Sequence, residues 1–221
     1  NMFAANPVKR KNLFAFINFN TSSNAIVRSD SVTAAGGRKT TYANANGIYN
    51  LFGNIEYGFP LKKLKSRIEI GTNATYNKSA SFVNGERNDI STVSFGPNIS
   101  YNFSMENKIE LEVSGRLSIN NSTYSLQPQA NNKYFRHNYG VDLTNYLPWG
   151  ITLSNQFNYI IHAGRAEGYN TNVPLWNASL AKGIMKNRRG EIKLGVADIL
   201  NKNTGIARTA NQGYIVDEKY N

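Results

Sequence analysis

A strict alternation of apolar and polar residues runs through most of this chain and limits what it can fold into. Between Ala43 and Phe59 the two classes occupy alternate positions over the whole segment. Side chains of a β-strand point in turn to opposite faces, so a period of two predicts a strand with one apolar and one amide-rich face. The apolar set is Ala45, Gly47, Tyr49, Leu51, Gly53, Ile55, Tyr57 and Phe59, and the polar set is Asn44, Asn46, Asn50, Asn54 and Glu56.

The same alternation recurs in eight other segments and gives nine predicted strands in total. Their ranges are 13–19, 43–59, 67–77, 92–103, 109–120, 135–147, 151–159, 176–180 and 192–196. Short turns lie at 60–66, 104–108, 148–150 and 186–190, and longer polar connections lie at 28–41, 78–89, 121–133 and 162–174. Tight turns between consecutive strands form antiparallel hairpins, so the chain predicts an all-β, antiparallel up-and-down meander.

Hydropathy alone does not place this meander in water or in lipid. A mean hydropathy of -0.46, with no apolar run of about 18 residues, excludes a transmembrane helix. A membrane-spanning barrel remains compatible, because every second strand residue faces a polar interior. In a soluble sandwich or a lipocalin-like barrel, the same apolar face would point into a core.

Strand length and aromatic placement favour lipid over water. Several predicted strands reach the roughly 9–11 residues that cross a bilayer when tilted. Aromatic residues also gather at both strand ends, as amphipathic rings do at two lipid–water interfaces. Those at the turn ends are Tyr57, Phe59, Tyr101, Phe103, Tyr146 and Trp149, and those at the opposite ends are Tyr76, Tyr124, Phe135, Tyr159 and Trp176. The sequence therefore predicts part of a transmembrane β-barrel.

The formal net charge of +11 has two interpretations. Clustered Lys and Arg can follow a phosphate backbone, which would indicate nucleic acid as a partner. Here the aromatics alternate with aliphatic residues rather than with the basic ones, so we expect no nucleic acid and instead solvated turns beside an anionic membrane surface. The basic turn residues are Lys9, Arg10, Lys11, Lys62, Lys63, Lys65, Lys108, Lys186, Arg188 and Arg189, opposed only by Glu106.

The chain offers little from which to build a catalytic or metal centre. It has no cysteine, and its two histidines, His137 and His162, lack ligand-like spacing. Glu110 and Glu112 share one strand face, where pairing with Arg116 is a better interpretation than a glycosidase pair. We therefore predict no enzyme, no cofactor and no metal. The candidate lumen-facing residues are Asn44, Asn46, Asn50, Asn54, Glu56, Glu69, Asn73, Asn98, Glu110, Glu112 and Arg116.

Two stretches carry a resemblance to a known family. The segment from Asn44 to Leu61 and the tail from Leu175 to Asn201 resemble the C-terminal half of Bacteroidetes-type outer-membrane β-barrel proteins related to TonB-dependent receptors. Residues 206–209 and 213–217 fit the same pattern. The resemblance implies location in the bacterial outer membrane. It also implies as partners outer-membrane lipid, a TonB-type energy transducer, a surface lipoprotein, and a small-molecule, oligosaccharide or peptide ligand.

The chain also departs from that family pattern. The family implies an N-terminal plug, a segment that engages the energy transducer and a closing strand that ends in an aromatic residue, and none is visible here. The chain stops at Lys219-Tyr220-Asn221, and nine strands is an odd number, whereas bacterial single-chain barrels are even. We expect residues 1–221 to be one barrel segment, the C-terminal part of a longer chain.

Three functions remain open from the sequence. The first is a transporter that imports a ligand captured by the long loops and passed along the Asn-rich lumen. The second is a barrel without transport that scaffolds or anchors a surface or secretion assembly. The third is a soluble basic β-domain that binds polyanions.

Overall fold

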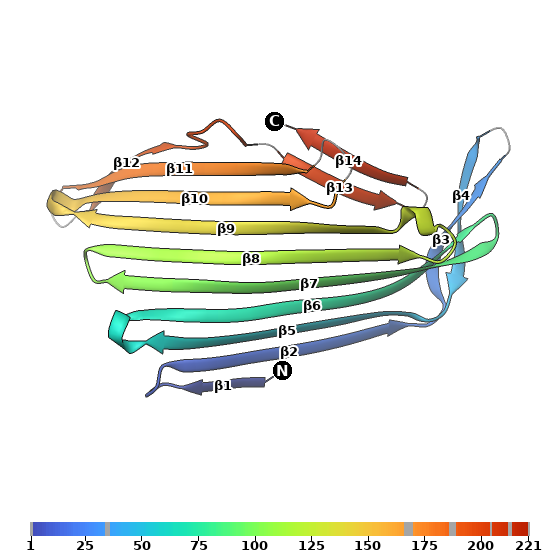
Figure 1. Ribbon diagram of the computed structural model, residues 1–221, viewed down its shortest axis with the longest axis horizontal. Coiled ribbons are helices and arrows are strands. Elements are labelled where there is room, and N and C mark those ends of the chain that lie inside the picture. Colours follow the sequence, from blue (N-terminus) through green and yellow to red (C-terminus); the bar gives the residue numbers. More distant parts are fainter. Residues whose placement is uncertain are drawn as a thin grey trace.

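A computed structural model describes residues 2–33, 36–165, 170–185, 189–203, 205–211 and 214–220, with side chains as far as residue 203. Ten strands lie side by side in one curved sheet, in the order β1-β2-β5-β6-β7-β8-β9-β10-β11-β12 (Figure 1). They are β1 (Met2–Asn6), β2 (Lys11–Ser22), β5 (Ile48–Leu61), β6 (Ser66–Val83), β7 (Glu86–Met105), β8 (Ile109–Tyr124), β9 (Asn132–Leu147), β10 (Ile151–Ala163), β11 (Thr171–Ile184) and β12 (Gly190–Val196).

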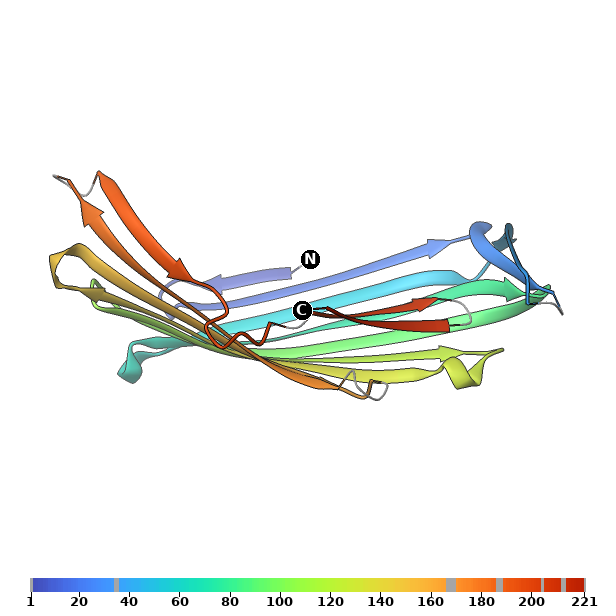
Figure 2. The ribbon, with the colours of Figure 1, turned by 90° about the horizontal axis from the view of Figure 1, so that it is seen from above.

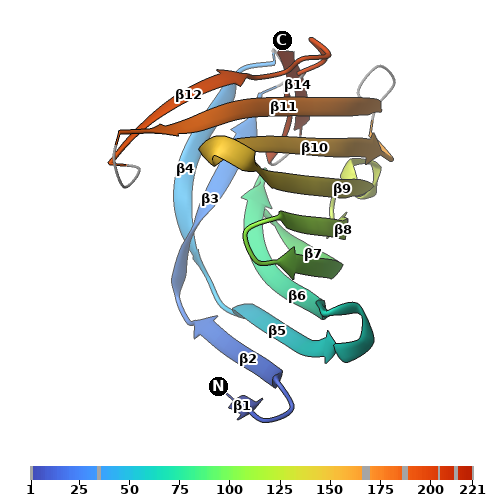
Figure 3. The same ribbon diagram turned by 90° about the vertical axis from the view of Figure 1, so that its left-hand side faces the viewer.

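Every pair of neighbours in this ten-strand sheet is antiparallel. The predicted pairing within hairpins is confirmed, since Leu180 lies opposite Leu194 and Ala178 lies opposite Val196. The all-β, up-and-down prediction is therefore correct. The sheet curves like a trough but stays open, with β1 and β12 at its edges (Figure 3).

Short helical turns close the β5–β6 and β9–β10 hairpins at one end of the sheet, called the turn end below. They are the 3-10 turns η1 (Lys62–Leu64) and η3 (Pro148–Gly150), and at the opposite, loop end lies η2 (Pro128–Ala130). Trp149 takes a positive φ of 62° inside η3 and is 84% exposed. None of the helices in the described ranges has the length or the apolar character that crossing a membrane requires.

The number and limits of the strands differ from the prediction. The sheet has ten neighbouring strands instead of nine, because β1 pairs with β2 ahead of the first predicted strand. The predicted strand 43–59 is in fact interrupted at Gly47, whose φ of 76° breaks the extended backbone between Ala45 and Ile48. Alternation continues across this break, so the residue pattern alone does not reveal it.

Two predicted connections are also strands. Residues 78–89 contain the ends of β6 and β7, joined by the two-residue turn Asn84–Gly85, so strands of 18 and 20 residues replace a long loop. In the connection 28–41, residues 28–32 belong to β3 (Ala25–Val32) and residues 38–41 to β4 (Arg38–Ala45), which pair with each other. The turn residues Lys186 and Arg188, and residues 166–169 of a predicted connection, lie outside the described residues.

The β3–β4 hairpin leaves the sheet at the loop end and lies across its open side (Figures 1 and 3). Strand β3 forms a short parallel bridge with the end of β6, where Ser29 lies opposite Phe82. Beneath it, Val27, Ala45 and Ala80 make a small buried cluster. Because β2 pairs directly with β5, this hairpin is an insertion in an otherwise sequential meander.

The two faces of the sheet differ in chemistry as the alternation predicts. One face carries exposed apolar side chains, including Ile55, Ile70 and Ile99 at 47%, 47% and 51% exposure. Figure 2 shows that the sheet is curved, with one hollow side. The polar residues between the apolar ones lie on the opposite face, and Asn102, Glu112 and Asp142 of that face line a cavity. A second sheet, of β13 (Gly205–Asn211) and β14 (Tyr214–Tyr220), forms a separate antiparallel hairpin near the C-terminus.

Candidate functional site

The hollow face of the sheet gathers most of the predicted lumen-facing residues into rows that cross several strands. Asn54 lies opposite Asn73, and Asn73 lies opposite Gly96. A neighbouring row runs from Glu56 through Gly71 and Asn98 to Arg116. Side chains at directly opposed positions are about 5 Å apart, so Asn54 lies beside Asn73, and Asn98 lies beside Arg116.

Glycines make room for the amides in these rows. The Oδ1 atom of Asn98 lies 2.8 Å from where a Cβ of Gly71 would stand, and that of Asn73 lies 2.6 Å from the corresponding point of Gly96. Each amide therefore lies flat over a glycine of the neighbouring strand. A larger residue at either glycine would displace the amide into the hollow of the sheet.

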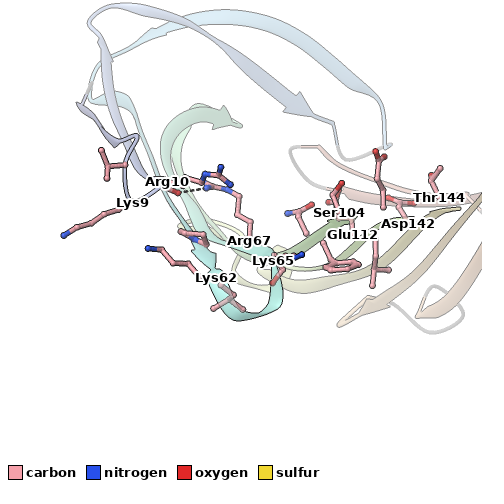
Figure 4. Close-up of a pocket in the computed structure, with 17 residues that line it drawn as sticks. Lys9, Arg10, Lys62, Lys65, Arg67, Ser104, Glu112, Asp142 and Thr144 are labelled. Atoms are coloured by element: carbon pink, nitrogen blue, oxygen red, sulfur yellow. Dashed lines mark hydrogen bonds between the residues drawn. The ribbon is translucent and has the colours of Figure 1, made fainter. Parts of the chain in front are cut away.

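A cavity of about 870 Å³ lies at the turn end of the sheet (Figure 4). One row of its lining crosses four strands, with Arg67 opposite Asn102, Asn102 opposite Glu112 and Glu112 opposite Asp142. The row thus runs from a cation on β6, through an amide on β7, to two carboxylates on β8 and β9. Glu110, also predicted to face the lumen, lines the cavity between Ser104 and Thr144.

Arg67 is fixed by partners from three parts of the chain. Its Nε donates to Oε1 of Glu69 at 2.8 Å, its Nη1 donates to the carbonyl oxygen of Arg10 at 2.9 Å, and its Nη2 donates to Oδ1 of Asn12. The guanidinium lies against Gly58, where any Cβ would collide with it. The charge of Arg67 is therefore largely matched by Glu69, and its role is to hold the β1–β2 turn against β6.

The remaining cations of the cavity gather on the side of Arg67. Lys9 and Arg10 come from the β1–β2 turn, and Lys62 and Lys65 come from the turn between β5 and β6. Lys65 takes a left-handed conformation with φ 48° at the end of η1. Figure 4 shows these side chains on one side of the cavity and Glu112 and Asp142 on the other.

The opposite side of the cavity carries unmatched negative charge. Glu112 and Asp142 lie directly opposite one another, an arrangement that destabilises a sheet when both groups are ionised. Among the described residues, neither carboxylate forms an ion pair or a side-chain hydrogen bond. The turn end of the hollow face is therefore divided into a basic wall (Lys9, Arg10, Lys62 and Lys65) and an acidic wall (Glu110, Glu112 and Asp142).

The loop end is organised by one buried carboxylate. Asp30 of β3 is only 2% exposed and pairs with Arg28 at 3.0 Å and with Arg38. Thr40 Oγ1 donates to the same carboxylate at 2.7 Å. These donors, led by Arg38, lower the pKa of Asp30 to about 2 despite the opposing effect of burial.

The turn Asn84–Gly85 clamps this hairpin to the sheet. The backbone N–H of Asn84 donates to the carbonyl oxygen of Asp30 at 2.8 Å, and the side-chain oxygen of Asn84 accepts from the backbone N–H of Val32 at 2.8 Å. These two hydrogen bonds tie β3 to the end of β6.

Some predicted site residues lie elsewhere. Asn44 and Asn46 precede the interruption at Gly47 and bind the backbone of Asn24 at the base of the β3–β4 hairpin, away from the rows. Asn50 lies near the loop end of β5, opposite Asn20 and Asn77. Asn44 and Asn46 therefore do not join the rows formed by Asn54, Asn73 and Asn98, whereas Asn50 shares a face with Asn54 and forms a further row with Asn20 and Asn77.

The expected ion pair of Arg116 with Glu110 or Glu112 is not present in the described part of the chain. Arg116 lies opposite Asn98 and Asn138 instead, several residues along the strand from both glutamates. In the ranges that the structure describes, no group of three or more His, Asp or Glu side chains comes together as a metal site.

The rings of two histidines and two phenylalanines lie on different parts of the sheet. His137 stands beside Tyr139 on the apolar face, with ring centroids 6.2 Å apart, whereas His162 is buried at the loop end of β10. Phe16 and Phe52 contact one another on the hollow face, with ring centroids 5.9 Å apart. Sequence reasoning did not place these rings there, although their positions in the alternation, in phase with Asn18 and Asn54, would have indicated it.

Comparison with known proteins finds one family. A family model described as the outer membrane protein beta-barrel family matches residues 87–221, which begin in β7 and include every later strand. No curated protein and no solved structure matches the chain.

Proposed function

The chain belongs to the outer membrane protein beta-barrel family, and from this premise we propose that it forms part of the wall of a transport barrel of the TonB-dependent-receptor type. Membership places the protein in the bacterial outer membrane. In a barrel there, the exposed apolar face would contact lipid and the polar face would line the lumen. Transport is the further step, and it rests on the chemistry of the hollow face.

The observation that carries the proposal is the set of polar rows that cross β5 to β9, backed by an exposed apolar surface on the same strands. Neutral amides and hydroxyls offer hydrogen bonds of about 0.5–1.5 kcal/mol each, weak enough for a ligand to exchange one for the next. A ligand captured at the loop end would therefore move along the rows toward the turn end. The mechanism is binding and passage, with no covalent step and no cofactor.

The proposal includes three partners. Outer-membrane lipid would contact the apolar face, a TonB-type energy transducer would supply the energy, and a surface lipoprotein would deliver or cover the ligand at the loop end. Ligands with many hydrogen-bonding groups, such as oligosaccharides or peptides, suit the Asn-rich rows better than strongly anionic chelates.

Reconstitution tests the proposal directly. The full-length protein that contains this chain would be placed in proteoliposomes, and uptake of labelled oligosaccharides and peptides measured with and without the energy transducer. We expect uptake that depends on the transducer. Equal uptake in both cases, or none in either, would overturn the proposal.

A scaffold without transport is the second candidate, and the clamped β3–β4 hairpin favours it. Its buried ion pairs give the loop end a defined shape, which suits recognition by another protein. In that case the reconstituted barrel would pass no solute, while deletion of residues 25–45 would release a surface partner that copurifies with the intact protein.

A further inference from the structure

The β3–β4 hairpin crosses the open side of the sheet at the loop end. Figures 1 and 3 show that it extends from β2 and β5 as far as the level of β11. The edge strands β1 and β12 lie on either side of the same open side, toward which the sheet curves (Figure 3). When the barrel is closed, the lumen lies on that side, so the hairpin lies over the mouth of the lumen.

Two residues with a left-handed backbone turn the chain out of the sheet. Asn24, between β2 and β3, has a φ of 55°, and Gly47, between β4 and β5, has a φ of 76°. A left-handed residue interrupts an extended strand, so both strands of the hairpin change direction at its base. The base is closed by Asn44 and Asn46, whose side chains bind the backbone of Asn24 at 3.0 and 2.6 Å.

A second attachment lies further along β3. The backbone N–H of Asn84 donates to the carbonyl oxygen of Asp30 at 2.8 Å, and β3 forms its parallel bridge with the end of β6 at the same level. Asn24 and Asp30 are six residues apart in sequence, which is roughly 20 Å of extended chain. A hairpin attached at two points this far apart cannot turn about its base unless the second attachment opens.

The wall itself does not require this hairpin. Ser22 of β2 lies directly opposite Ile48 of β5, where a turn of two residues would be enough to join the strands. The chain instead inserts two further strands and holds them with the buried carboxylate of Asp30 and the hydrogen bonds of Asn84. These contacts therefore serve the position of the hairpin and not the pairing of the wall.

We propose that the β3–β4 hairpin covers the mouth of the lumen and limits the size of the solutes that enter from the loop end. Opening of the attachment between Asn84 and Asp30 raises this limit. The inference goes beyond the proposed function, because it concerns entry alone and holds whether or not the barrel transports a ligand.

Thiol labelling of the full-length protein in intact cells tests the proposal, because residues 1–221 contain no cysteine. Any cysteine elsewhere in the protein is replaced by serine. Arg116→Cys then places one thiol at an exposed position of the hollow face, eight residues from the loop end of β8, or roughly 27 Å along the strand. The small reagent N-ethylmaleimide and a bulky maleimide-linked dextran are added from outside, which the loop end faces.

With the hairpin in place, we expect N-ethylmaleimide to label Arg116→Cys and the dextran reagent to label it far more slowly. Replacement of residues 23–47 by Asn-Gly, a two-residue hairpin turn, should accelerate the dextran reaction at least about tenfold. The matched control is Gln129→Cys, exposed in η2 at the loop end and outside the hairpin, which should react equally with and without residues 23–47.

Two results would overturn the proposal. One is an equal dextran rate at Arg116→Cys with and without the hairpin. The other is no labelling by either reagent in both proteins, since the barrier to entry would then lie elsewhere.

A second variant keeps the full chain length, so the test does not depend on the folding of the shortened protein. Asp30→Asn loosens the hairpin without removing it, and the dextran reagent should then label Arg116→Cys at least about tenfold faster. Asp89→Asn, which removes an exposed carboxylate near the same end, should leave the rate unchanged. Equal rates in the two variants would contradict control by the attachment at Asp30.

Comparison with uptake separates this inference from the proposed function, because labelling requires no energy transducer. If uptake does not depend on the transducer while the hairpin still excludes the dextran reagent, the proposed function fails and the inference stands. If uptake depends on the transducer but dextran labels the lumen equally with and without the hairpin, the inference fails and the function stands.

Discussion

The ten-strand wall and the β3–β4 hairpin are built on different principles. Each strand of the wall is held by ladders to its sequence neighbours and by side chains that repeat at every second residue. The hairpin is held by single, specific contacts: the carboxylate of Asp30, the clamp from Asn84 and the small cluster around Val27. The wall therefore depends on a pattern, whereas the hairpin depends on particular residues.

This difference predicts how each region responds to change. In the wall, the effect of a substitution on stability should depend more on the face where the residue lies than on its identity, because many equivalent contacts stabilise each strand. In the hairpin, one substitution at the buried carboxylate should have a large local effect, because no neighbouring contact repeats its role. The following predictions test that contrast, from the largest expected effect to the smallest.

Adjacent positions on β5 give the largest contrast within the wall. Ile55→Arg places a charge on the exposed apolar face and should reduce the free energy of unfolding in lipid vesicles by about 2–4 kcal/mol. Asn54→Arg, one residue away on the polar face, should change it by less than about 1 kcal/mol. Urea titration of both variants measures the difference, and equal effects would mean that the apolar face does not contact lipid.

Asp30→Asn should cause the largest local loss in the hairpin. The amide places an N–H donor among the donors of Arg28, Arg38 and Thr40, so the free energy of opening the hairpin should fall by about 3 kcal/mol. Amide exchange at Val32 should then accelerate roughly 100-fold, while amides of the wall keep their rates.

The matched control for Asp30→Asn is the exposed ion pair of Arg87 with Asp89, whose side chains are 38% and 39% exposed. Asp89→Asn should change local stability by less than about 1 kcal/mol, because solvent screens that pair. Similar effects of the two substitutions would contradict the special role of the buried carboxylate.

Acid should open the hairpin before it affects the wall. The pKa of Asp30 is lowered from 3.8 to about 2, so its stabilisation is complete above about pH 4 and is lost as pH falls through about 2. The full loss is about 2 kcal/mol. Exchange at Val32 and Asn84, corrected for intrinsic rates, should stay constant from pH 7 to pH 4 and rise below it, and a rise already at pH 6 would implicate another group.

Two glycines of the wall test how closely the lumen is packed. A Cβ at Gly71 would stand 2.8 Å from Asn98 Oδ1 and 3.2 Å from the backbone oxygen of Ile55, so Gly71→Ala should cost about 1 kcal/mol. At Gly115, on the apolar face, the nearest atom is 3.7 Å away, and Gly115→Ala should be neutral or slightly stabilising. Equal urea midpoints for the two variants would show that the amide of Asn98 moves freely.

The same contrast explains what could be predicted from the sequence. Alternation repeats in every wall strand, so the hairpin that joins residues 176–180 to residues 192–196 followed from the pattern, and the structure adds the register, with Leu180 opposite Leu194. Residues 28–41 are rich in Ser, Thr, Arg and Lys and lack an apolar alternation, so they were interpreted as a loop. Their strand structure depends on contacts with Asn84 and Ala80, which are distant in sequence.

The residues of the polar face could be predicted from the same alternation, whereas their grouping in space could not. The amides and glutamates on the polar face were identified by phase, including Asn73, Asn98 and Glu112. The interruption at Gly47, which separates Asn44 and Asn46 from the rows, depends on one backbone angle that the alternation does not encode. The division of charge in the cavity also required the register, because Arg67 and Asp142 are far apart in sequence and meet only through β7 and β8.

The direct pairing of β2 with β5 has a consequence for how such a wall can change over generations. Ser22 pairs directly with Ile48, so the register of β2 with β5 does not depend on the segment between these two residues. The entropy of closing a loop grows only with the logarithm of its length, and a doubling costs about 0.6 kcal/mol. Insertions and deletions in this segment should therefore change the free energy of β2–β5 pairing by little. The register between β2 and β5 can therefore stay the same while the segment between these strands varies in length and sequence.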